Sequence, residues 1–539
     1  MTDTMETGIR GDLEWGTTPG LVRSAAERFG EAAALIDGDV RLSFAGLASA
    51  VLDAGRAFVA AGLGPGDRVA IWSPNVWEWV VAVLGLQSAG GVVVPINTRY
   101  KGAEAGYLLD RSRARILVTV NGFLGNDYVS MLDGYDLPNL EHTVVLRGDV
   151  PIGATSWGDF VAGGFRVDAS EVDARVAALT AEDVSDILFT SGTTGNPKGA
   201  VCTHGQVVRA YADWAALVGL RPGDRYLVIN PFFHAFGYKA GIIAALTAGA
   251  TLYPQSVFDI PTAMANVAEH RITMLPGPPA VYQTFLNHPD VDLSKLQSLR
   301  LAVTGAAAVP VELVERMKRE LGFETVVTGY GLTESCGITT MCRHDDSAET
   351  ISTTSGRAIP GVDVKVVDDG GREVPRGEPG EVIVRGYNVM REYFEDPEQT
   401  AHAIDADGWL HTGDMGTMDE RGYLVITDRK KDMFITGGFN AYPAEIERLL
   451  LLNPDVAQVA VIGVPDERMG EVGMAFVVPA AGTSPEPAAL VAWARGTMAN
   501  FKVPREVRIV EALPMNASNK VLKTELREWA AKKGASTHG

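Results

Sequence analysis

The chain has 539 residues, of which 46% are hydrophobic and 21% are charged, and its formal net charge is −20. One hydrophobic core does not serve a chain of this length, so we expect at least two domains. The acidic balance argues against nucleic acid or an anionic lipid surface as a general partner, and an acidic substrate would need a local positive site.

The first 120 residues alternate between helical and strand patterns, which predicts a doubly wound, largely parallel sheet. The helical patterns cover residues 21–29, 44–61 and 77–89, and the strand patterns cover residues 68–71, 91–96 and 115–120. Residues 121–180 carry weak signals and are interpreted as a connecting region. The alternation resumes over residues 181–345, which predicts a second sheet within one large N-terminal unit.

The most apolar stretch, residues 76–94, is interrupted by a glutamate, a glutamine and three glycines. A membrane span needs about 20 predominantly apolar residues, so this stretch favours a buried helix followed by a buried strand. The first ten residues carry acidic groups where a signal peptide needs a basic region, and they are interpreted as a short disordered lead. We therefore expect a cytoplasmic protein without integral membrane association. A homodimer remains open.

Three cysteines, Cys202, Cys336 and Cys342, form no C-x-x-C pair and have no histidine at metal-ligand spacing. This pattern favours free, buried thiols in a reducing compartment over disulfides or a metal site.

From residue 355 the pattern changes to short strands separated by Gly, Asp and Pro turns, which predicts a β-rich subdomain. A charge cluster at residues 428–432 is either a solvated turn or a hinge. A small α/β unit follows it, with a helix near residues 443–452 and a strand at 456–464. We therefore predict a large N-terminal domain at residues 1–428 and a small C-terminal domain at residues 429–539.

The richest site signal is the run F-T-S-G-T-T-G-N-P-K-G at residues 189–199. A short buried strand precedes it, and its glycines permit close backbone approach to an anion. The hydroxyls add donors and the lysine adds a compact charge, although a Gly/Thr surface turn has a similar composition. The predicted phosphate-binding residues are Thr190, Ser191, Gly192, Thr193, Thr194, Gly195 and Lys198.

The order of residues in this loop resembles the phosphate loop of adenylate-forming enzymes, which include acyl-CoA synthetases, firefly-type luciferases and the adenylation domains of peptide synthetases. A second motif, T-G-Y-G-L-T-E at residues 328–334, agrees with that resemblance. Tyr330 offers a face for stacking, Thr333 a hydroxyl for phosphate, and Glu334 a hard oxygen ligand for Mg2+. The resemblance assigns these three to adenine, the α-phosphate and the metal respectively. It adds Thr194 at the metal, and Gly329 and Gly331 beside the nucleotide.

Small residues at 305–308 follow a predicted strand, where a flat base could lie against the backbone. The resemblance places Gly305, Ala306 and Ala307 beside adenine, although two alanines depart from the family's G-G-A-P pattern.

The remaining nucleotide and CoA assignments lie towards the C-terminus. Asp414 could accept hydrogen bonds from both ribose hydroxyls or be an exposed turn acid. The resemblance assigns Asp414 and Arg429 to ribose, Lys431 to the hinge, Gly438 to the pantetheine tunnel, and Lys520 to the charge that develops during adenylation.

Residues 231–238 cluster aromatic side chains around His234, a pattern that suits either a core or a site. The resemblance favours the site, with the histidine gating entry of the thiol. It implies an acyl pocket lined by His234, Phe236, Gly237, Tyr238, Gly277, Gly305, Gly329, Cys336, Gly337 and Ile338. Lys239 could meet a substrate carbonyl or be a surface-paired lysine.

Taken together, the resemblance implies an ATP-, Mg2+- and coenzyme A-dependent acid-thiol ligase, with Lys520, His234, Thr194 and Glu334 in the chemistry. Its implied fold is α/β, with two doubly wound sheets and a β-rich subdomain in an AMP- and acyl-binding domain at residues 1–428, and a small mobile α/β domain at residues 429–539. The closest motif match is to actinobacterial ligases for a bicyclic propanoate from sterol ring degradation, and medium-chain fatty acid ligases share most features. The alternative is an enzyme that loads an acyl group onto a carrier protein, or a luciferase-like oxidative enzyme.

Overall fold

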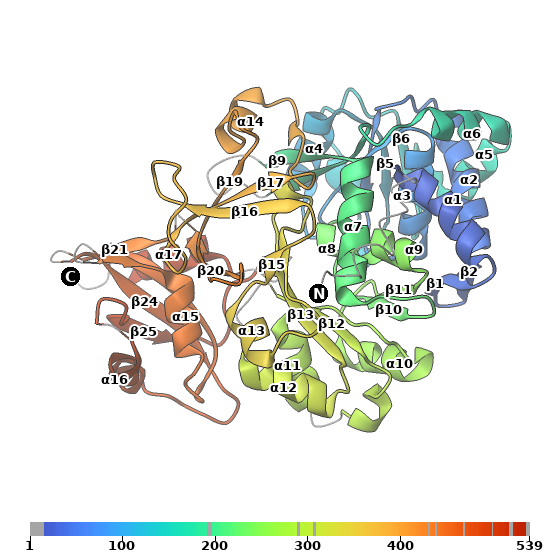
Figure 1. Ribbon diagram of the computed structural model, residues 1–539. Helices are drawn as coiled ribbons and strands as arrows, with labels where there is room; N and C mark the ends of the chain where they lie inside the picture. Colours follow the sequence, from blue (N-terminus) through green and yellow to red (C-terminus); the bar gives the residue numbers. More distant parts are fainter. Residues whose placement is uncertain are drawn as a thin grey trace.

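The computed structural model describes residues 16–190, 197–287, 291–305, 309–429, 432–436, 439–466, 469–498, 500–516 and 521–534. A large α/β part carries two main sheets, and a β-rich subdomain connects it to a small C-terminal α/β unit (Figure 1). This architecture confirms the predicted fold class. The predicted disordered lead lies outside the described residues.

The first sheet has eight strands, and its central region is parallel. Its order is β18 (Glu392–Tyr393), β9 (Lys198–Thr203), β8 (Val184–Thr190), β4 (Val92–Pro95), β3 (Arg68–Trp72), β5 (Ala114–Thr119), β6 (His142–Val145) and β7 (Thr155–Ser156). Among the described residues, the antiparallel pairs of this sheet are β8 with β9 and β9 with β18. The strands are short and rich in Val, Ile and Leu, as expected where helices cover both faces of a sheet.

The second sheet is assembled from distant parts of the chain. It contains β2 (Val40–Ser43), β1 (Ala33–Asp37), β11 (Thr251–Pro254) and β10 (Arg225–Val228), and continues with β12 (Leu301–Thr304), β13 (Thr325–Tyr330), β14 (Thr340–Met341) and β15 (Arg357–Ala358). A single residue, Met274, bridges β10 to β12. Because β12 and β13 are parallel, their carboxyl ends meet at one edge.

Helices cover both sheets and fill the layer between them. They are α1 (Thr18–Phe29), α2 (Phe44–Ala60), α3 (Trp77–Ser88), α4 (Gly102–Ser112), α5 (Trp157–Gly164), α6 (Ala169–Ala178), α7 (His204–Val218), α8 (Ala235–Gly237), the π-helical segment η4 (Tyr238–Ile243), α9 (Ala244–Ala248), α10 (Ile260–His270), α11 (Pro279–Asn287) and α12 (Val311–Glu320). The helix α3 contacts strands of both sheets, which explains why it is apolar on all sides and buried along most of its length.

The predicted division of the strands between the two sheets is wrong in two respects. The region 121–180, expected as a connection, contains β6, β7, α5 and α6 and completes the first sheet. The hairpin β1–β2 belongs to the second sheet, whereas β8 and β9 belong to the first. Local patterns report that a segment is a strand, but they do not report which sheet receives it.

The β-rich subdomain is an antiparallel sheet in the order β16 (Val362–Val367), β17 (Gly380–Gly386), β19 (Leu410–Met418) and β20 (Leu424–Arg429). The short helix α14 (Pro397–Ala403) contacts β19, whereas α13 (Ala348–Thr353) packs against α12 and β13. The alternating strand and turn pattern predicted this subdomain correctly.

The C-terminal unit has its own sheet and cores. Its strands are β22 (Phe439–Ala441), β21 (Phe434–Thr436), β24 (Gly470–Pro479), β23 (Val456–Asp466) and β25 (Glu506–Ile509), and its helices are α15 (Pro443–Leu450), α16 (Pro487–Thr497) and α17 (Lys523–Gly534). Its buried apolar residues form clusters separate from the large N-terminal core, which ends at Leu424. The proposed boundary at residues 428–429 falls between these cores and remains a prediction.

In the described part of the chain, no helix is both long enough and apolar enough to cross a membrane. All three cysteines are buried and unpaired by disulfides, as predicted.

Candidate active site

The predicted phosphate loop connects two paired strands of the first sheet. Thr190 ends β8 and lies directly opposite Lys198, which begins β9. The Thr190 hydroxyl donates to the Lys198 carbonyl oxygen at 3.4 Å. The Lys198 ammonium donates to the side-chain oxygen of Gln399, 201 residues away in the sequence, and lies 5.2 Å from the centre of the Tyr393 ring. The cation at the end of the loop is therefore held by α14 and β18.

Tyr393 connects this lysine to the predicted metal ligand. Its backbone pairs with Ala200 on β9, and its hydroxyl donates to Oε1 of Glu334 at 2.8 Å. Burial, and then the neighbouring Glu334 carboxylate, raise the pKa of Tyr393. The hydroxyl therefore remains a donor at neutral pH and fixes the carboxylate beside Lys198.

Glu334 fits a magnesium ligand. It lies in the one-turn helix η6 (Thr333–Ser335), and its Oε2 makes no hydrogen bond or ion pair within the described residues. The described ranges contain no group of three or more His, Cys, Asp or Glu side chains that could hold a metal by themselves. Mg2+ commonly takes one or two carboxylates together with substrate phosphates and waters, and a single half-buried glutamate beside a predicted phosphate loop suits that arrangement.

The residues assigned to adenine and ribose also converge. Gly305 follows β12, and its α-carbon faces the Gly329 carbonyl at the end of β13. The Tyr330 hydroxyl donates to Oδ2 of Asp414 at 2.6 Å, across 84 residues of sequence. Asp414 is only 5% exposed, so the alternative of an exposed turn acid is wrong. Across the β19–β20 pair, Arg429 lies directly opposite Asp414.

His234 is the predicted gate of the acyl pocket. Its Nδ1 accepts a hydrogen bond from the Phe236 backbone N–H at 3.1 Å. The residue is exposed, although protein atoms surround the imidazole. This enclosure, and then the Lys239 cation, lower the pKa of His234, so the imidazole is neutral at pH 7.

Close packing explains several of the small residues in this wall. A Cβ on Gly237 would overlap the carbonyl oxygens of Pro231 and Asn230. Gly277 donates its backbone N–H to Val303 on β12 and lies beside the end of β10. The wall also includes Phe236, which is half-buried, and Ile338, which is buried.

The predicted wall residue Tyr238 and its neighbour Lys239 are directed into the protein. Tyr238 is fully buried and accepts a hydrogen bond from Gln87 on α3. Lys239 is also fully buried, and its Nζ lies 2.9 Å from Oδ1 of Asp186 on β8. The surface-paired alternative for Lys239 is therefore wrong. Its partner is a buried carboxylate, and its second contact is Sγ of Cys336 at 3.6 Å.

Sequence reasoning missed Gln399, Tyr393, Asp186 and Tyr211, although their contacts hold Lys198, Glu334, Lys239 and Cys336. No local sequence pattern distinguishes these four residues.

Ten assigned residues lie outside the described ranges: Ser191, Gly192, Thr193, Thr194, Gly195, Ala306, Ala307, Lys431, Gly438 and Lys520.

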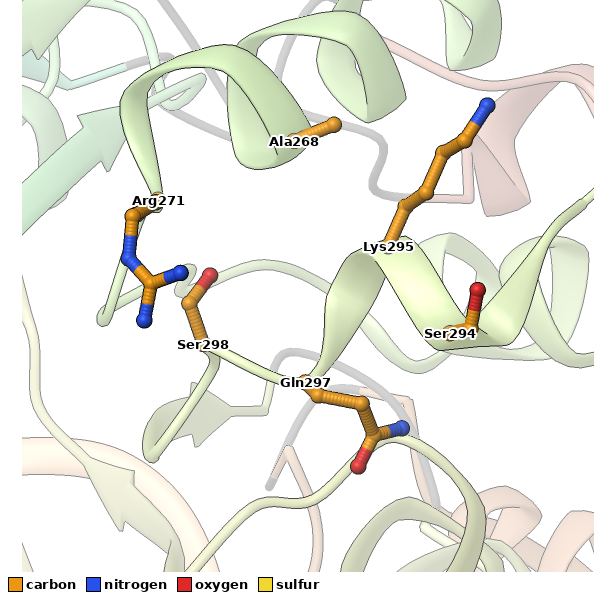
Figure 2. Close-up of a pocket in the computed structure, with 6 residues that line it drawn as sticks. All are labelled: Ala268, Arg271, Ser294, Lys295, Gln297 and Ser298. Carbon is orange, nitrogen blue, oxygen red and sulfur yellow. The ribbon is translucent and has the colours of Figure 1, made fainter.

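A separate hollow of about 220 Å³ is lined by Ala268, Arg271, Ser294, Lys295, Gln297 and Ser298 (Figure 2). These residues belong to α10, the one-turn helix η5 (Leu293–Leu296) and the segments that follow them. None of the six is a predicted site residue. The hollow is therefore distinct from the converging residues described above.

Comparison with known proteins agrees with this arrangement. The "AMP-binding enzyme" family model matches residues 22–394, and the "AMP-binding enzyme C-terminal domain" model matches residues 445–520. A methyl-dioxo-octahydroindenyl propanoyl:CoA ligase of Rhodococcus jostii is 51% identical over 517 residues, covering 95% of this chain and 98% of the relative.

Solved structures show the same similarity. The anthranilate CoA ligase AuaEII in complex with anthranoyl-AMP has a TM-score of 0.85 at 28% identity, covering 96% of this chain and 98% of that one. ATP-bound MatB from Rhodopseudomonas palustris has a TM-score of 0.81 at 29% identity, covering 95% and 99% of the two chains. Since the family model spans more than half of the sequence and a full-length relative shares half of its residues, the chain belongs to the AMP-binding enzyme family.

Proposed function

We propose that the protein is an AMP-forming carboxylic acid-CoA ligase. The observation that carries this proposal is the connected set Lys198–Tyr393–Glu334, with Tyr330 and Asp414 joined beside it. A cation, a carboxylate free to bind a metal, and an aromatic ring beside a second carboxylate are the groups that a magnesium-bound nucleotide requires.

In the proposed first step, a carboxylate oxygen of the acid attacks the α-phosphorus of ATP, and pyrophosphate leaves. The reacting groups are both anionic, so the site must supply positive charge and fixed donors. Lys198 and the hydroxyls of the 190–195 loop bind the phosphates, and Glu334 holds Mg2+, which supplies charge stabilisation when bound. Tyr330 and Asp414 orient the nucleoside, and Lys520 stabilises the charge that develops.

In the proposed second step, the thiol sulfur of coenzyme A attacks the acyl carbon. The thioester bond forms, AMP leaves, and the thiol proton passes to solvent. His234 is suited to line this entry because it is neutral and accessible. Lys520 and Gly438 belong to the same C-terminal unit, and we propose that rotation about Lys431 brings each to the site in turn.

We further propose a bicyclic propanoate with ring ketones as the acid. Support comes from the Rhodococcus jostii relative, whose name states that substrate class and which shares half of its residues with this chain. Medium-chain fatty acids are the competing class.

Acid-dependent and CoA-dependent AMP release would test the proposal, with the bicyclic propanoate, octanoate and benzoate as substrates. We expect release without any protein acceptor, and the highest kcat/KM for the bicyclic acid. Release that requires a carrier protein would favour the carrier-loading alternative. A preference for octanoate would reject the proposed substrate while leaving the ligase intact.

A further inference from the structure

The corner at Cys336 has an unusual backbone conformation. Its φ is 58°, in the left-handed region that residues with a side chain seldom adopt. It closes the short helix that carries Thr333 and Glu334, since the Cys336 N–H donates to the Thr333 carbonyl at 3.1 Å. A non-glycine residue in this conformation persists only where its surroundings hold it there.

Two buried side chains hold this corner. The Tyr211 hydroxyl donates to the Cys336 carbonyl at 3.1 Å, and the Lys239 ammonium lies 3.6 Å from the Cys336 sulfur. Lys239 is itself fixed by Asp186, at 2.9 Å, and the two side chains are 1% and 0% exposed. The Cys336 thiol also contacts the thiol of Cys202. The corner is therefore restrained at its backbone and at its side chain.

The corner lies between the predicted metal ligand and the predicted acyl wall. Glu334 is two residues before it, and Gly337 follows it directly. A Cβ on Gly337 would lie 2.5 Å from the Tyr211 hydroxyl and 2.9 Å from the Ala235 Cβ, beside His234. A displacement at Cys336 would therefore move Glu334 and the acyl wall together.

A buried ion pair seldom stabilises a fold more than apolar residues of the same size, because both charges lose their hydration. The pair Lys239–Asp186 therefore calls for a role besides stability. It connects β8, which leads into the phosphate loop, with η4, which follows His234, and it touches the corner that leads from Glu334.

We propose that Lys239, anchored by Asp186, is a positioning residue that acts through the Cys336 sulfur to set Glu334 relative to the acyl wall. This inference rests on the proposed ligase function. It assigns no substrate contact to Lys239.

The first test is Cys336→Ala, which removes the sulfur and leaves the ion pair intact. ATP–pyrophosphate exchange is measured against acid concentration and against Mg2+ concentration. We expect the KM for the acid and the half-activating Mg2+ concentration each to rise about tenfold, because small misplacements of reacting groups are costly. The control is Cys342→Ala, which removes another buried thiol, one that lies 3.8 Å from the Thr354 hydroxyl and does not touch the Lys239–Asp186 pair; we expect wild-type kinetics.

The second test is the double variant Lys239→Met/Asp186→Leu, which leaves no buried charge without its partner. The double variant should raise the KM for the acid and the half-activating Mg2+ concentration as Cys336→Ala does. Adding Cys336→Ala to the double variant should raise neither quantity further. The double variant also provides the readout if Cys336→Ala does not fold.

Wild-type values in Cys336→Ala, or additive effects in the combined variant, would overturn the positioning role. Failure of the wild-type protein and Cys342→Ala to catalyse any acid-dependent exchange would instead overturn the ligase assignment, and the positioning role with it.

Discussion

The contact between Tyr393 and Glu334 offers a sharp test of the proposed site. Tyr393→Phe removes only the hydroxyl that donates to Glu334 Oε1 at 2.8 Å. The ring that lies beneath the Lys198 ammonium, and that packs with Ala200 and Met390, is retained. Any loss of activity therefore reports on the orientation of the carboxylate.

The expected loss of activity in Tyr393→Phe follows from the strength of the hydrogen bond to Glu334. A hydrogen bond to a charged group contributes about 1.5–3 kcal/mol, and Tyr393 is only 8% exposed, so water replaces the lost donor poorly. A loss of about 2 kcal/mol in transition-state stabilisation corresponds to a decrease of about thirtyfold in kcat/KM. ATP–pyrophosphate exchange at several Mg2+ concentrations would measure it, and the half-activating concentration should rise.

Tyr423→Phe is the matched control. Tyr423 is 7% exposed, and its hydroxyl donates to Asp346 at 2.6 Å, outside the converging residues. Both variants should lose similar stability in thermal unfolding, whereas only Tyr393→Phe should lose exchange activity. An exchange rate within twofold of wild type, or an equal loss in both variants, would refute the assignment of Glu334 to the metal site.

Three other outcomes follow from the structure. Gly237→Ala should lower the free energy of unfolding by about 1–3 kcal/mol, because the added methyl group would overlap the Pro231 carbonyl. Gly158→Ala is the control, since the space beside Gly158 is open, and it should leave the free energy of unfolding unchanged. Thermal denaturation of the two variants would distinguish these outcomes. Burial lowers the pKa of His204 to about 4. The folded protein therefore favours the neutral imidazole. The contribution of His204 to the free energy of unfolding is complete above about pH 6.5. It decreases by about 1.4 kcal/mol per pH unit as the pH falls towards 4. Denaturant titrations at several pH values would measure the free energy of unfolding of wild type and of His204→Gln. The difference between the two proteins should change with pH by that amount, and the same pH dependence in both would contradict the prediction. Lys520→Ala should abolish formation of the acyl-adenylate and preserve conversion of a supplied acyl-adenylate to the thioester. The two half-reactions would be measured separately. Loss of both half-reactions would contradict the proposed rotation about the hinge.

Much of the fold was predictable because its signals are local. The helical patterns at residues 44–61 and 77–89 correspond to α2 and α3 within one residue at each end, and the strand predicted at 68–71 matches β3 within one residue. Hydrophobic periodicity and turn residues report the state of one segment and its burial. They could not show that β1 pairs with β11, more than two hundred residues further along, because strand pairing depends on how whole layers pack.

The candidate site divides in the same way. The sequence by itself determined the chemistry available: a Gly- and hydroxyl-rich loop ending in Lys198, an aromatic and acidic motif at residues 328–334, and Asp414. Only the tertiary structure decided which of these groups hold one another. Tyr330 meets Asp414, Tyr393 joins Lys198 to Glu334, and Lys239 is buried against Asp186 although its sequence context suited a surface position. These partners lie 53 to 195 residues apart in the sequence, and their contacts form only when the sheets, the helical segment after His234 and the β-rich subdomain pack together.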